Sequence, residues 1–430
     1  MNKDEFFKQQ FGVSDDVLRL TEDAERSAAE QFKHIEETAQ LNSLKVMKAF
    51  ADNRVSSECF LPSYGYGTDD YGRDLLDKIY AQIFESEDAL VRHNFISGTH
   101  TLSTMLFAVL RPGDTVAAIT GKPYDTLEEV VGITGKAGNG SLADFGIEYM
   151  QLDLAADSSP DYAAIEKLLK SKKIKAVWIQ RSKGYGERKT FSAAEIGEMI
   201  AFVKRISPET LALVDNCYGE FVDDREPTAY GADLCGGSLI KNAGAGIAPT
   251  GGYIVGKAKY IEMCACRLSS VGIGRENGAT LGMNKPLYQG LFFAPHVVSQ
   301  ALKTAVLCAA VYEKLGYKVE PPSDEIRHDI IQAVRLEKPE ALIAFCRGIQ
   351  KGSPVDAYAA PEPGDMPGYT DKVIMAAGAF HQGSSIELSA DGPMREPYMV
   401  YMQGGVTYET AKLGIVMSVQ AMKDAGIILT

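Results

Sequence analysis

Short apolar runs alternate with helical stretches through the middle of the chain, and this alternation constrains the fold more than any other feature. Apolar runs of strand length occur at residues 115–119, 176–179, 211–214 and 253–255. Amphipathic stretches with helical spacing lie between them, at residues 102–110, 162–170 and 193–205. Strands that alternate with helices in this way predict an α/β fold built on a mainly parallel, doubly wound sheet.

The two ends of the chain differ from this central part. Residues 1–55 are predicted to form a helical arm that packs on a partner, with Ser14 as a helix cap. We expect residues 56–290 to form a large domain and residues 291–430 to form a smaller C-terminal α+β domain. In that smaller domain, helices are predicted at residues 295–315, 329–349 and 407–425, and strands at residues 372–380 and 385–388.

The charge of the chain argues against nucleic acid as a partner. The 57 acidic side chains outnumber the 44 basic ones, the formal net charge is -13, and no basic stripe stands out. The N-terminus has no apolar segment of signal-peptide length, and nowhere do about 18 apolar residues follow one another. We therefore expect a cytoplasmic protein that has no membrane contact.

The cysteines are scattered along the chain. There are 7 of them, and the only close pair is Cys264-Ala-Cys266. An odd and dispersed set predicts neither a disulfide framework nor a paired-cysteine zinc site, so we expect reduced thiols. No spacing of the HExxH type occurs, and no metal site is predicted.

Two residues of the central part indicate a particular chemistry. Asp215 ends the apolar run Leu-Ala-Leu-Val-Asp, and Lys241 lies in the later segment Gly-Gly-Ser-Leu-Ile-Lys. A lysine amine can form a Schiff base with the aldehyde of pyridoxal phosphate, while a buried carboxylate can keep the pyridine nitrogen protonated. The pair therefore predicts a pyridoxal phosphate site. The same spacing also arises by chance, because many strands end in Asp and many Gly-rich loops contain Lys.

A phosphate site is predicted where Ser97, Gly98 and Thr99 precede a helical stretch. A turn of this composition at a helix N-terminus offers backbone donors and the positive end of the helix dipole to a phosphate. Ser238, three residues before Lys241, can add a hydroxyl. The alternative interpretation is an ordinary helix cap at Ser97 and a simple turn residue at Ser238.

Tyr124 follows the predicted strand at residues 115–119. It therefore emerges at the carboxyl end of the strand, where open parallel sheets bind their ligands. An aromatic ring at this place can stack on a pyridine ring. The alternative is a tyrosine that closes the core and leaves its hydroxyl in water.

Taken together, these segments resemble the Cys/Met-metabolism group of fold type I pyridoxal-phosphate enzymes, which includes cystathionine lyases and methionine gamma-lyase. The resemblance rests on Ser97-Gly98-Thr99, Pro123-Tyr124, Val214-Asp215-Asn216 and Ser238-Leu-Ile-Lys241, in that order. A closer resemblance, to the methionine-gamma-lyase-like family that carries the label aluminium resistance protein, rests on residues 180–185, 383–392 and 401–408.

The resemblance implies a role for each matching residue. Lys241 would bind the cofactor covalently, Asp215 would pair with its ring nitrogen, and Tyr124 would stack on its ring. Ser97, Gly98, Thr99 and Ser238 would hold the phosphate. The family architecture further implies a homodimer or a homotetramer, in which Tyr66 reaches the phosphate site of the neighbouring subunit.

The chain departs from the better-known lyases at the neighbouring-subunit loop. Those enzymes have an Arg two residues after the tyrosine, whereas Tyr66 is followed by Gly67 and Thr68. A different cationic residue must therefore bind the phosphate. Arg73 does not match the position of that arginine closely enough to be assigned the role.

An amino-acid substrate needs a partner for its carboxylate, and the planar fork of an arginine matches carboxylate geometry. Arg395 is the first candidate, Arg181 is its competitor, and Tyr185 is a further candidate for substrate contact. A solvated pair between Arg395 and Glu396 is an equally good interpretation.

These features predict a lyase that breaks a carbon–sulfur bond in a small sulfur amino acid such as cystathionine or methionine, by beta- or gamma-elimination. Lys241 would act as the general base, which requires a pKa below its ordinary value of about 10.4, and Tyr124 would assist the leaving group. Two alternatives stay open. One is another fold type I pyridoxal-phosphate enzyme, aldolase-like or aminotransferase-like, and the other is a stress-linked protein with this fold and little catalysis.

Overall fold

The computed structural model describes residues 1–64, 70–366, 369 and 371–428. The chain forms two compact units. The large unit comprises residues 42–293, and the small unit combines residues 1–41 with residues 294–430. The sequence had grouped the chain differently, with residues 1–55 as a separate arm. In the structure, residues 1–41 share a unit with the C-terminal part of the chain.

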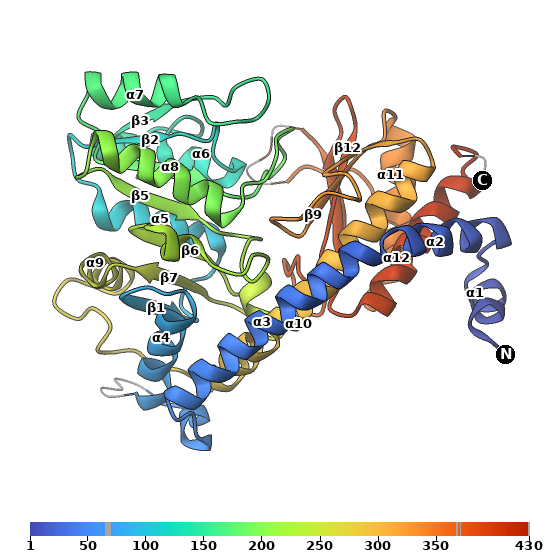
Figure 1. Ribbon diagram of the computed structural model, residues 1–430, viewed down its shortest axis with the longest axis horizontal. Coiled ribbons are helices and arrows are strands. Elements are labelled where there is room, and N and C mark those ends of the chain that lie inside the picture. The colour runs from blue at the N-terminus through green and yellow to red at the C-terminus, as the bar shows by residue number, and fades with distance from the viewer. Residues whose placement is uncertain (65–69, 367–368, 370, 429–430) are drawn as a thin grey trace. The chain divides into compact units, whose positions relative to one another are not determined.

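A seven-stranded sheet forms the centre of the large unit (Figure 1). Its strands are β1 (Asp88–Arg92), β2 (Thr115–Ala118), β3 (Glu148–Gln151), β4 (Ala176–Gln180), β5 (Leu211–Asp215), β6 (Leu234–Ser238) and β7 (Gly252–Gly256). Their spatial order is β1-β7-β6-β5-β4-β2-β3. Every neighbouring pair from β6 to β3 runs parallel, whereas β7 runs antiparallel to β1 and β6. The predicted α/β class with a mainly parallel sheet is confirmed.

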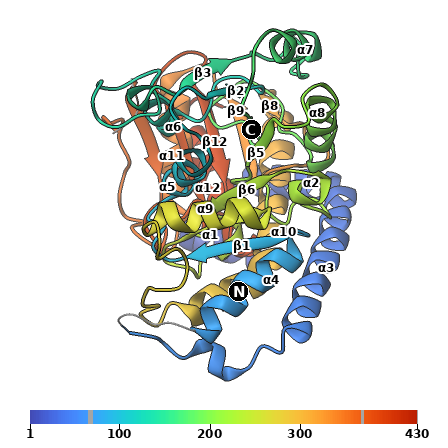
Figure 2. The same cartoon turned by 90° about the vertical axis from the view of Figure 1, so that its left-hand side faces the viewer.

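Helices cover both faces of this sheet. They are α4 (Tyr71–Ile83), α5 (Gly98–Val109), α6 (Asp125–Val131), α7 (Tyr162–Ser171), α8 (Ala193–Ile206) and α9 (Ala258–Leu268). Figure 2 shows α5 and α9 on one side of the sheet and α7 and α8 on the other. Buried residues of α5 such as Leu102 and Met105 pack with alternate strand residues such as Trp178 and Leu213. Coverage on both faces explains why the strands read as continuous apolar runs.

The sequence did not predict β6, because its residues Leu-Cys-Gly-Gly-Ser have little strand propensity. The close packing of the large unit explains the glycines. A Cβ placed on Gly237 would lie 2.3 Å from Oε1 of Glu220 and 2.8 Å from the hydroxyl of Tyr253. The strand therefore forms through its hydrogen bonds to β5 and β7, and side chains are excluded at this point.

The small unit contains a five-stranded antiparallel sheet. Its strands are β8 (Lys318–Glu320), β9 (Ile331–Arg335), β10 (Val373–Ala376), β11 (Ser389–Pro393) and β12 (Met399–Gln403), in the order β10-β11-β12-β9-β8. Helices α11 (Pro339–Lys351) and α12 (Tyr408–Asp424) pack against each other, and both contribute to the core of this unit.

Two predictions in the small unit are wrong. Residues 329–349 were expected to form one helix, but β9 occupies their first part because it pairs on both edges, with β12 and β8. Residues 385–388 were expected to form a strand, but Leu388 has a φ of 125°, which an extended strand does not allow. The carboxylate of Glu387 instead accepts hydrogen bonds from the amides of Phe380 and His381.

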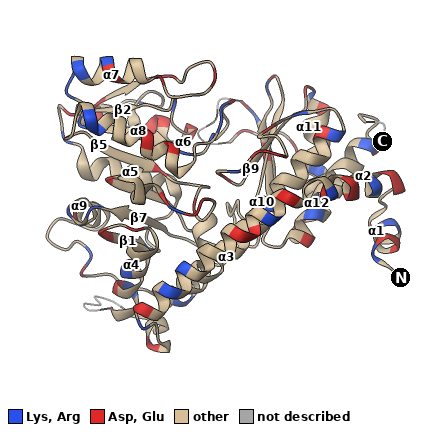
Figure 3. Ribbon diagram, viewed as in Figure 1, with Lys and Arg blue, Asp and Glu red and all other residues tan. Residues whose placement is uncertain are grey.

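The first part of the chain is helical, as predicted. It forms α1 (Lys3–Phe11), α2 (Asp15–Ser27) and α3 (Ala29–Asp52). Ser14 precedes α2, but its side chain does not cap the helix, because its backbone N–H and its hydroxyl both donate to Gln420. Acidic and basic residues are interspersed along α3 (Figure 3).

Helix α10 (Asn284–Lys314) is the one helix of the described residues that is long and apolar enough to cross a membrane. Its most apolar window has a mean hydropathy of 1.3, and 72% of that window is buried inside the structure. The prediction started this helix at residue 295, but Pro295 lies inside it. The division between the two units falls within α3 and α10.

The contact between α11 and α12 provides a test of the small unit. A Cβ placed on Gly348 would lie 2.3 Å from Cα of Ser418 and 2.4 Å from the carbonyl oxygen of Met417. Helix propensity alone favours Gly348→Ala by about 1 kcal/mol, but these clashes with backbone atoms cannot be relieved by a side-chain rotation. We therefore expect a net destabilisation of about 2 kcal/mol, measured as a lower thermal midpoint. In the control Gly364→Ala, the added Cβ meets no atom within 4 Å, so the midpoint should stay close to wild type.

Candidate active site

The predicted site residues lie at one edge of the large sheet. Asp215 ends β5, Ser238 ends β6, and Tyr124 follows β2. The strands are in register, so that Gln180 at the end of β4 pairs with Asp215, and Asp215 pairs with Gly236 of β6. Parallel strands bring their carboxyl ends to the same edge, where open α/β sheets bind ligands.

Lys241 lies against the N-terminus of α5. Its Nζ is 4.0 Å from the position that a Cβ on Gly98 would occupy, and 4.0 Å from the ring centroid of Tyr218. The same Cβ position lies 3.3 Å from Cβ of Ser238 and 3.6 Å from Sγ of Cys217. Gly98 is far in the sequence from Ser238 and Lys241, but it is their neighbour in space.

The N-terminus of α5 has the properties of an anion-binding turn. Oγ of Ser97 accepts a hydrogen bond of 3.1 Å from the amide of His100, so the Ser97 side chain is an ordinary helix cap. Oγ1 of Thr99 and Oγ1 of Thr126 are hydrogen-bonded at 2.6 Å, which ties α5 to α6. A helix leaves its first amides without intrahelical acceptors, and Gly98 and Thr99 supply two of them. These amides and the helix dipole can hold a phosphate.

Asp215 is a buried carboxylate whose Oδ1 accepts a hydrogen bond of 3.0 Å from the amide of Cys217. Only 5% of the residue is exposed. Burial raises the pKa of Asp215, and the charge of Lys241 offsets this only in part. A further cation beside the carboxylate, such as a protonated pyridine nitrogen, would lower the pKa again. The residue therefore fits the ring-nitrogen partner that the sequence predicted.

Tyr124 lies among the loops at the same edge. Its amide donates a hydrogen bond of 2.6 Å to Oε1 of Gln180, the residue that pairs with Asp215. A Cβ placed on Gly184 would lie 3.1 Å from Cδ2 of Tyr124, so a side chain at this position would crowd the ring. The rings of Tyr124 and Tyr185 have centroids 6.3 Å apart. The structure thus brings both predicted tyrosines to the edge that carries Asp215.

The structure contradicts Arg181 as a ligand for a substrate carboxylate. None of its side chain is exposed. Nη2 forms an ion pair of 2.6 Å with Asp223, and Nη1 donates a hydrogen bond of 2.8 Å to Asn216 and lies 3.4 Å from Glu226. Nε donates to the carbonyl of Phe191. An arginine whose donors are committed to buried acceptors stabilises the fold and cannot reach a substrate.

Arg395 and Tyr66 are the other two residues that the sequence predicted for the site. Arg395 belongs to the small unit, where its side chain is 53% exposed and its Nη1 lies 2.9 Å from Asp371. Its role toward a substrate stays a prediction. Tyr66 lies outside the described residues.

The pKa of Lys241 differs from the value that a general base needs. Burial is the largest single influence and lowers the pKa. Cys217, Tyr218, Asp215 and Glu220 each raise it, and together they outweigh burial, so the pKa is raised. The chain alone therefore favours a charged ammonium at Lys241. A bound cofactor would have to change this balance before the amine could accept a proton.

Sequence reasoning missed a buried polar network behind Lys241. The hydroxyl of Tyr253 donates a hydrogen bond of 2.8 Å to Oε1 of Glu220, and Nδ2 of Asn216 donates to Tyr253 at 3.2 Å and to Glu226 at 2.9 Å. Glu220 is fully buried. A glutamate between Gly219 and Phe221, five residues after the end of an apolar strand, was the signal available in the sequence.

Glu220 and Asn242 each have one buried side-chain oxygen that lacks a hydrogen-bond donor within the described residues. Oε2 of Glu220 and Oδ1 of Asn242 have no hydrogen-bond partner among the described residues. Nδ2 of Asn242 donates to the backbone carbonyls of Glu220 and Tyr218, so these segments are joined. Burial raises the pKa of Glu220 to about 8. A protonated Glu220 would carry a donor, which removes the cost of a buried unpaired carboxylate.

Known proteins share this architecture. A pyridoxal-5'-phosphate dependent protein, YhfS from Escherichia coli, superimposes with a TM-score of 0.61 at 16% identity, covering 91% of this chain and 97% of that one. At this identity the likeness concerns the fold alone. The fold is that of the fold type I pyridoxal-phosphate-dependent proteins.

Proteins with higher sequence identity to this chain identify the family within this fold class. Residues 17–423 match the family described as methionine gamma-lyase, and the chain belongs to that family. A Clostridium novyi protein described as a carbon-sulfur lyase involved in aluminum resistance is 48% identical, with a TM-score of 0.94, covering 98% of this chain and all of that one. The uncharacterized Bacillus subtilis protein YnbB is 53% identical over 92% of this chain and 94% of its own length.

The raised pKa of Glu220 predicts a pH dependence of stability. Its carboxyl keeps a proton in the folded chain up to pH 8, whereas an unfolded glutamate loses it near its ordinary value of 4.5. Wild-type stability therefore falls as the pH rises from 4.5 to 8. Glu220→Gln cannot ionise, and its amide can replace the protonated carboxyl. We expect its free energy of unfolding to equal that of wild type at about pH 5. At about pH 8.5 it should exceed that of wild type by about a few kcal/mol.

Unfolding midpoints measured across this pH range test the prediction. The exposed Glu198→Gln on α8 is the control, and its curve should stay parallel to that of wild type. Parallel curves for Glu220→Gln and wild type would show that Glu220 does not hold its proton in the folded chain.

Proposed function

We propose that this protein is a pyridoxal-phosphate-dependent carbon–sulfur lyase that acts on a sulfur amino acid such as cystathionine or methionine. In the reaction, the carbon–sulfur bond breaks, the thiol leaves with a proton, and water releases ammonia and a keto acid. Membership of the methionine gamma-lyase family and the description of the Clostridium novyi relative support this reaction class. The proposal includes a homodimer or homotetramer in the cytoplasm, as expected from the sequence.

One observation carries the proposal more than any other. Nζ of Lys241 lies beside Gly98 at the N-terminus of α5, on the same sheet edge as the buried carboxylate of Asp215. An amine, an anion-binding turn and a carboxylate are the three groups that the aldehyde, the phosphate and the ring nitrogen of the cofactor require. The fit comes from residues that the chain separates widely.

Each part of the cofactor then has a partner in the chain. Lys241 would bind it covalently, and Asp215 would pair with its ring nitrogen. The phosphate would be held by the α5 turn, Ser97 to Thr99, together with Ser238. Tyr124 would lie against the ring. When bound, pyridoxal phosphate supplies an electron sink for the negative charge left on the alpha carbon of an amino acid.

Lys241 moves the proton in this scheme. With the cofactor and substrate bound and its amine free, Nζ of Lys241 would remove the alpha proton as a general base. The pKa of Lys241 is raised, so its amine would hold an accepted proton firmly. The hydroxyl of Tyr124 would donate a proton to the departing sulfur, since its segment borders both Gln180 and Thr99.

The substrate carboxylate needs a cationic partner other than Arg181. Arg188 belongs to the same loop as Tyr185, and its charge lowers the pKa of Asp215, so it lies within electrostatic reach of the site. Its Nη2 donates to the carbonyls of Gln180 and Ser182, which fixes the guanidinium at the end of β4. Arg188 joins Arg395 as a candidate for this role.

Replacement of Lys241 tests the proposal directly. We expect Lys241→Ala to fold normally but to lose at least about a thousandfold of the wild-type kcat, because the base and the covalent attachment point disappear together. Borohydride should fix the cofactor to wild-type protein and not to the variant, as measured by mass spectrometry. The exposed Lys285→Ala is the control and should behave as wild type in both measurements.

Release of keto acid from cystathionine, methionine and cysteine distinguishes the proposal from its alternatives. A lyase releases thiol and keto acid in equal amounts from at least one of the three. Amino-group transfer to an added keto acid, or aldehyde release from a hydroxy amino acid, would identify a different pyridoxal-phosphate enzyme. Cofactor binding without turnover of any substrate would contradict the lyase proposal and favour the alternative of a stress-linked protein with little catalysis.

Asp215 provides a second test. The substitution Asp215→Asn keeps the size of the side chain but removes the charge that stabilises a protonated ring nitrogen. We expect kcat/KM to fall by about a hundredfold or more while the cofactor stays attached to Lys241. The exposed Asp224→Asn should leave kcat/KM unchanged. Wild-type kcat/KM in Asp215→Asn would exclude the assigned role of Asp215.

A further inference from the structure

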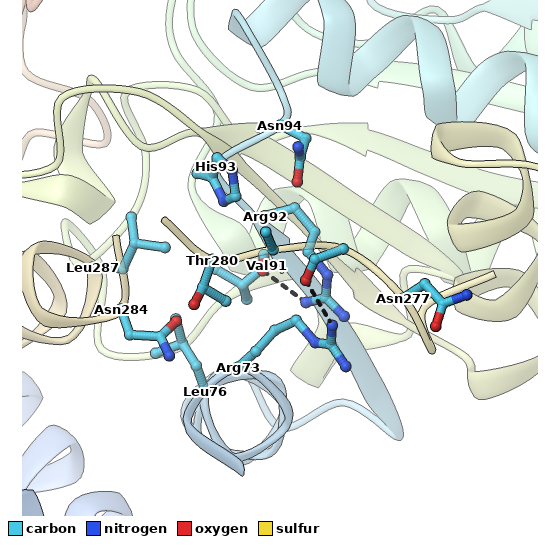
Figure 4. A pocket seen from close by; sticks show the side chains of 12 residues that line it. Arg73, Leu76, Val91, Arg92, His93, Asn94, Asn277, Thr280, Asn284 and Leu287 are labelled. Carbon is cyan, nitrogen blue, oxygen red and sulfur yellow. Dashed lines mark hydrogen bonds between the residues drawn. The ribbon is translucent and has the colours of Figure 1, made fainter. Parts of the chain in front are cut away.

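A second polar pocket lies in the large unit (Figure 4). It is a small, partly open hollow between the start of α4, the end of β1 and the segment that leads into α10. Its lining consists of Arg73, Leu76, Val91, Arg92, His93, Asn94, Asn277, Gly278, Ala279, Thr280, Asn284 and Leu287. None of the predicted site residues is among them.

Arg92 offers this pocket a hydrogen-bond donor with no acceptor in the described part of the chain. Its side chain is 7% exposed. Nη1 forms an ion pair of 2.8 Å with Oδ1 of Asp77 and donates to the carbonyl of Val91 at 2.7 Å. Nη2 is buried and has no hydrogen-bond partner among the described residues. A buried charged donor without an acceptor is costly, and a bound anion would remove that cost.

A second buried guanidinium lines the same pocket. The side chain of Arg73 is 5% exposed, and its Nη1 donates to the carbonyl of Gly278 at 3.2 Å. Figure 4 shows the guanidinium groups of Arg73 and Arg92 pointing toward each other. Each guanidinium already pairs with one carboxylate, Arg73 with Asp74 at 2.9 Å and Arg92 with Asp77 at 2.8 Å. An anion beside both groups would add an acceptor for charge-assisted hydrogen bonds.

The remaining polar lining suits an anion as well. The side chains of His93, Asn94 and Asn277 all carry N–H donors. Burial, and to a smaller extent the charge of Arg92, lower the pKa of His93, so it offers one N–H as a neutral imidazole. Among the described residues that line the pocket there is no Asp or Glu, although the chain has 57 acidic residues.

The nearby carboxylates hold the pocket in place without filling it. Asp77 accepts hydrogen bonds from the amide of Val91 and from Nη1 of Arg92, which orients the guanidinium and leaves Nη2 uncommitted. Asp70 accepts from Thr280 and Asn284, so these two residues are already engaged. The donors that can serve a ligand are therefore those of Arg92 with His93, Asn94 and Asn277.

We propose that this pocket binds a small oxyanion of the phosphate type, with Nη2 of Arg92 as its central donor. A planar guanidinium matches the geometry of two phosphate oxygens, and neutral N–H donors complete the shell. The site is separate from the residues assigned to the cofactor, and the proposal does not depend on the proposed lyase activity.

Calorimetric titration with inorganic phosphate tests the proposal. The full-length, cofactor-loaded protein is used at constant ionic strength, so that the α5 turn already holds its own phosphate. We expect saturable binding of one phosphate per chain. Cofactor absorbance recorded throughout shows that phosphate does not displace the cofactor.

Two variants assign the bound phosphate to this pocket. Arg92→Lys keeps a positive charge for Asp77 but removes the second guanidinium nitrogen, and we expect at least about a tenfold loss of affinity. Asn277→Asp does not touch the core and places a carboxylate at the pocket, and we expect a similar loss. Asn139→Asp makes the same change on an exposed loop elsewhere in the large unit and should bind phosphate as wild type does.

Phenyl phosphate distinguishes a free anion from the end of a larger ligand. Affinity equal to that of inorganic phosphate would indicate a phosphorylated molecule, whereas weaker binding would indicate the free anion, and both results support the site. Absence of saturable phosphate binding would overturn the proposal. Equal affinity in wild type, Arg92→Lys and Asn277→Asp would also overturn it, because the phosphate would then bind elsewhere.

Discussion

The close approach of Lys241 to the N-terminus of α5 is the contact on which the site depends. It brings an amine next to the positive end of a helix, an arrangement that electrostatics does not favour for a charged ammonium. A Cβ on Gly98 would be in ordinary contact with Nζ of Lys241, at 4.0 Å, so the amine packs directly on the first turn of α5. The carboxylate of Asp215 partly compensates for the charge of the ammonium. Such a place suits a ligand that is anionic at one end and reacts with an amine at the other. Pyridoxal phosphate has this combination, which is why the proposed function starts from this contact.

The polar network behind Lys241 gives the site its rigidity. Arg181, Asn216, Glu226, Tyr253 and Glu220 are linked by hydrogen bonds beneath the sheet edge, and each is buried. Buried polar groups stabilise a fold only when their partners are in place, so such a network tolerates few alternative arrangements. It therefore holds the loop after β5 that carries Cys217 and Tyr218, and through that loop the surroundings of Lys241. Arg181 has its function here, although the sequence suggested a role toward the substrate.

Much of the large unit could be predicted because its signals are local. The apolar runs of β2, β4, β5 and β7 and the periodic stretches of α5, α7 and α8 are visible in short windows of sequence. The strand β6 was not visible, because Gly236 and Gly237 are required by neighbours that belong to other segments. The strand β9 was mistaken for helix for a related reason. Its extended form comes from pairing with β8 and β12, and this pairing leaves no mark in the residues themselves.

The sequence by itself determined the alternation of strands and helices in the large unit and the residue types that the site contains, since periodicity and chemical identity are properties of short segments. It identified Lys241 and Asp215 because a cofactor of this kind requires an amine and a carboxylate. Only the tertiary structure decided which side chains are buried and which of them already have partners. Burial and pairing depend on residues that are distant in sequence. For that reason only the structure excluded Arg181 as a substrate ligand and identified Glu220 as part of the buried network near Lys241. The donor of Arg92 that has no acceptor within the described ranges likewise became visible only in three dimensions.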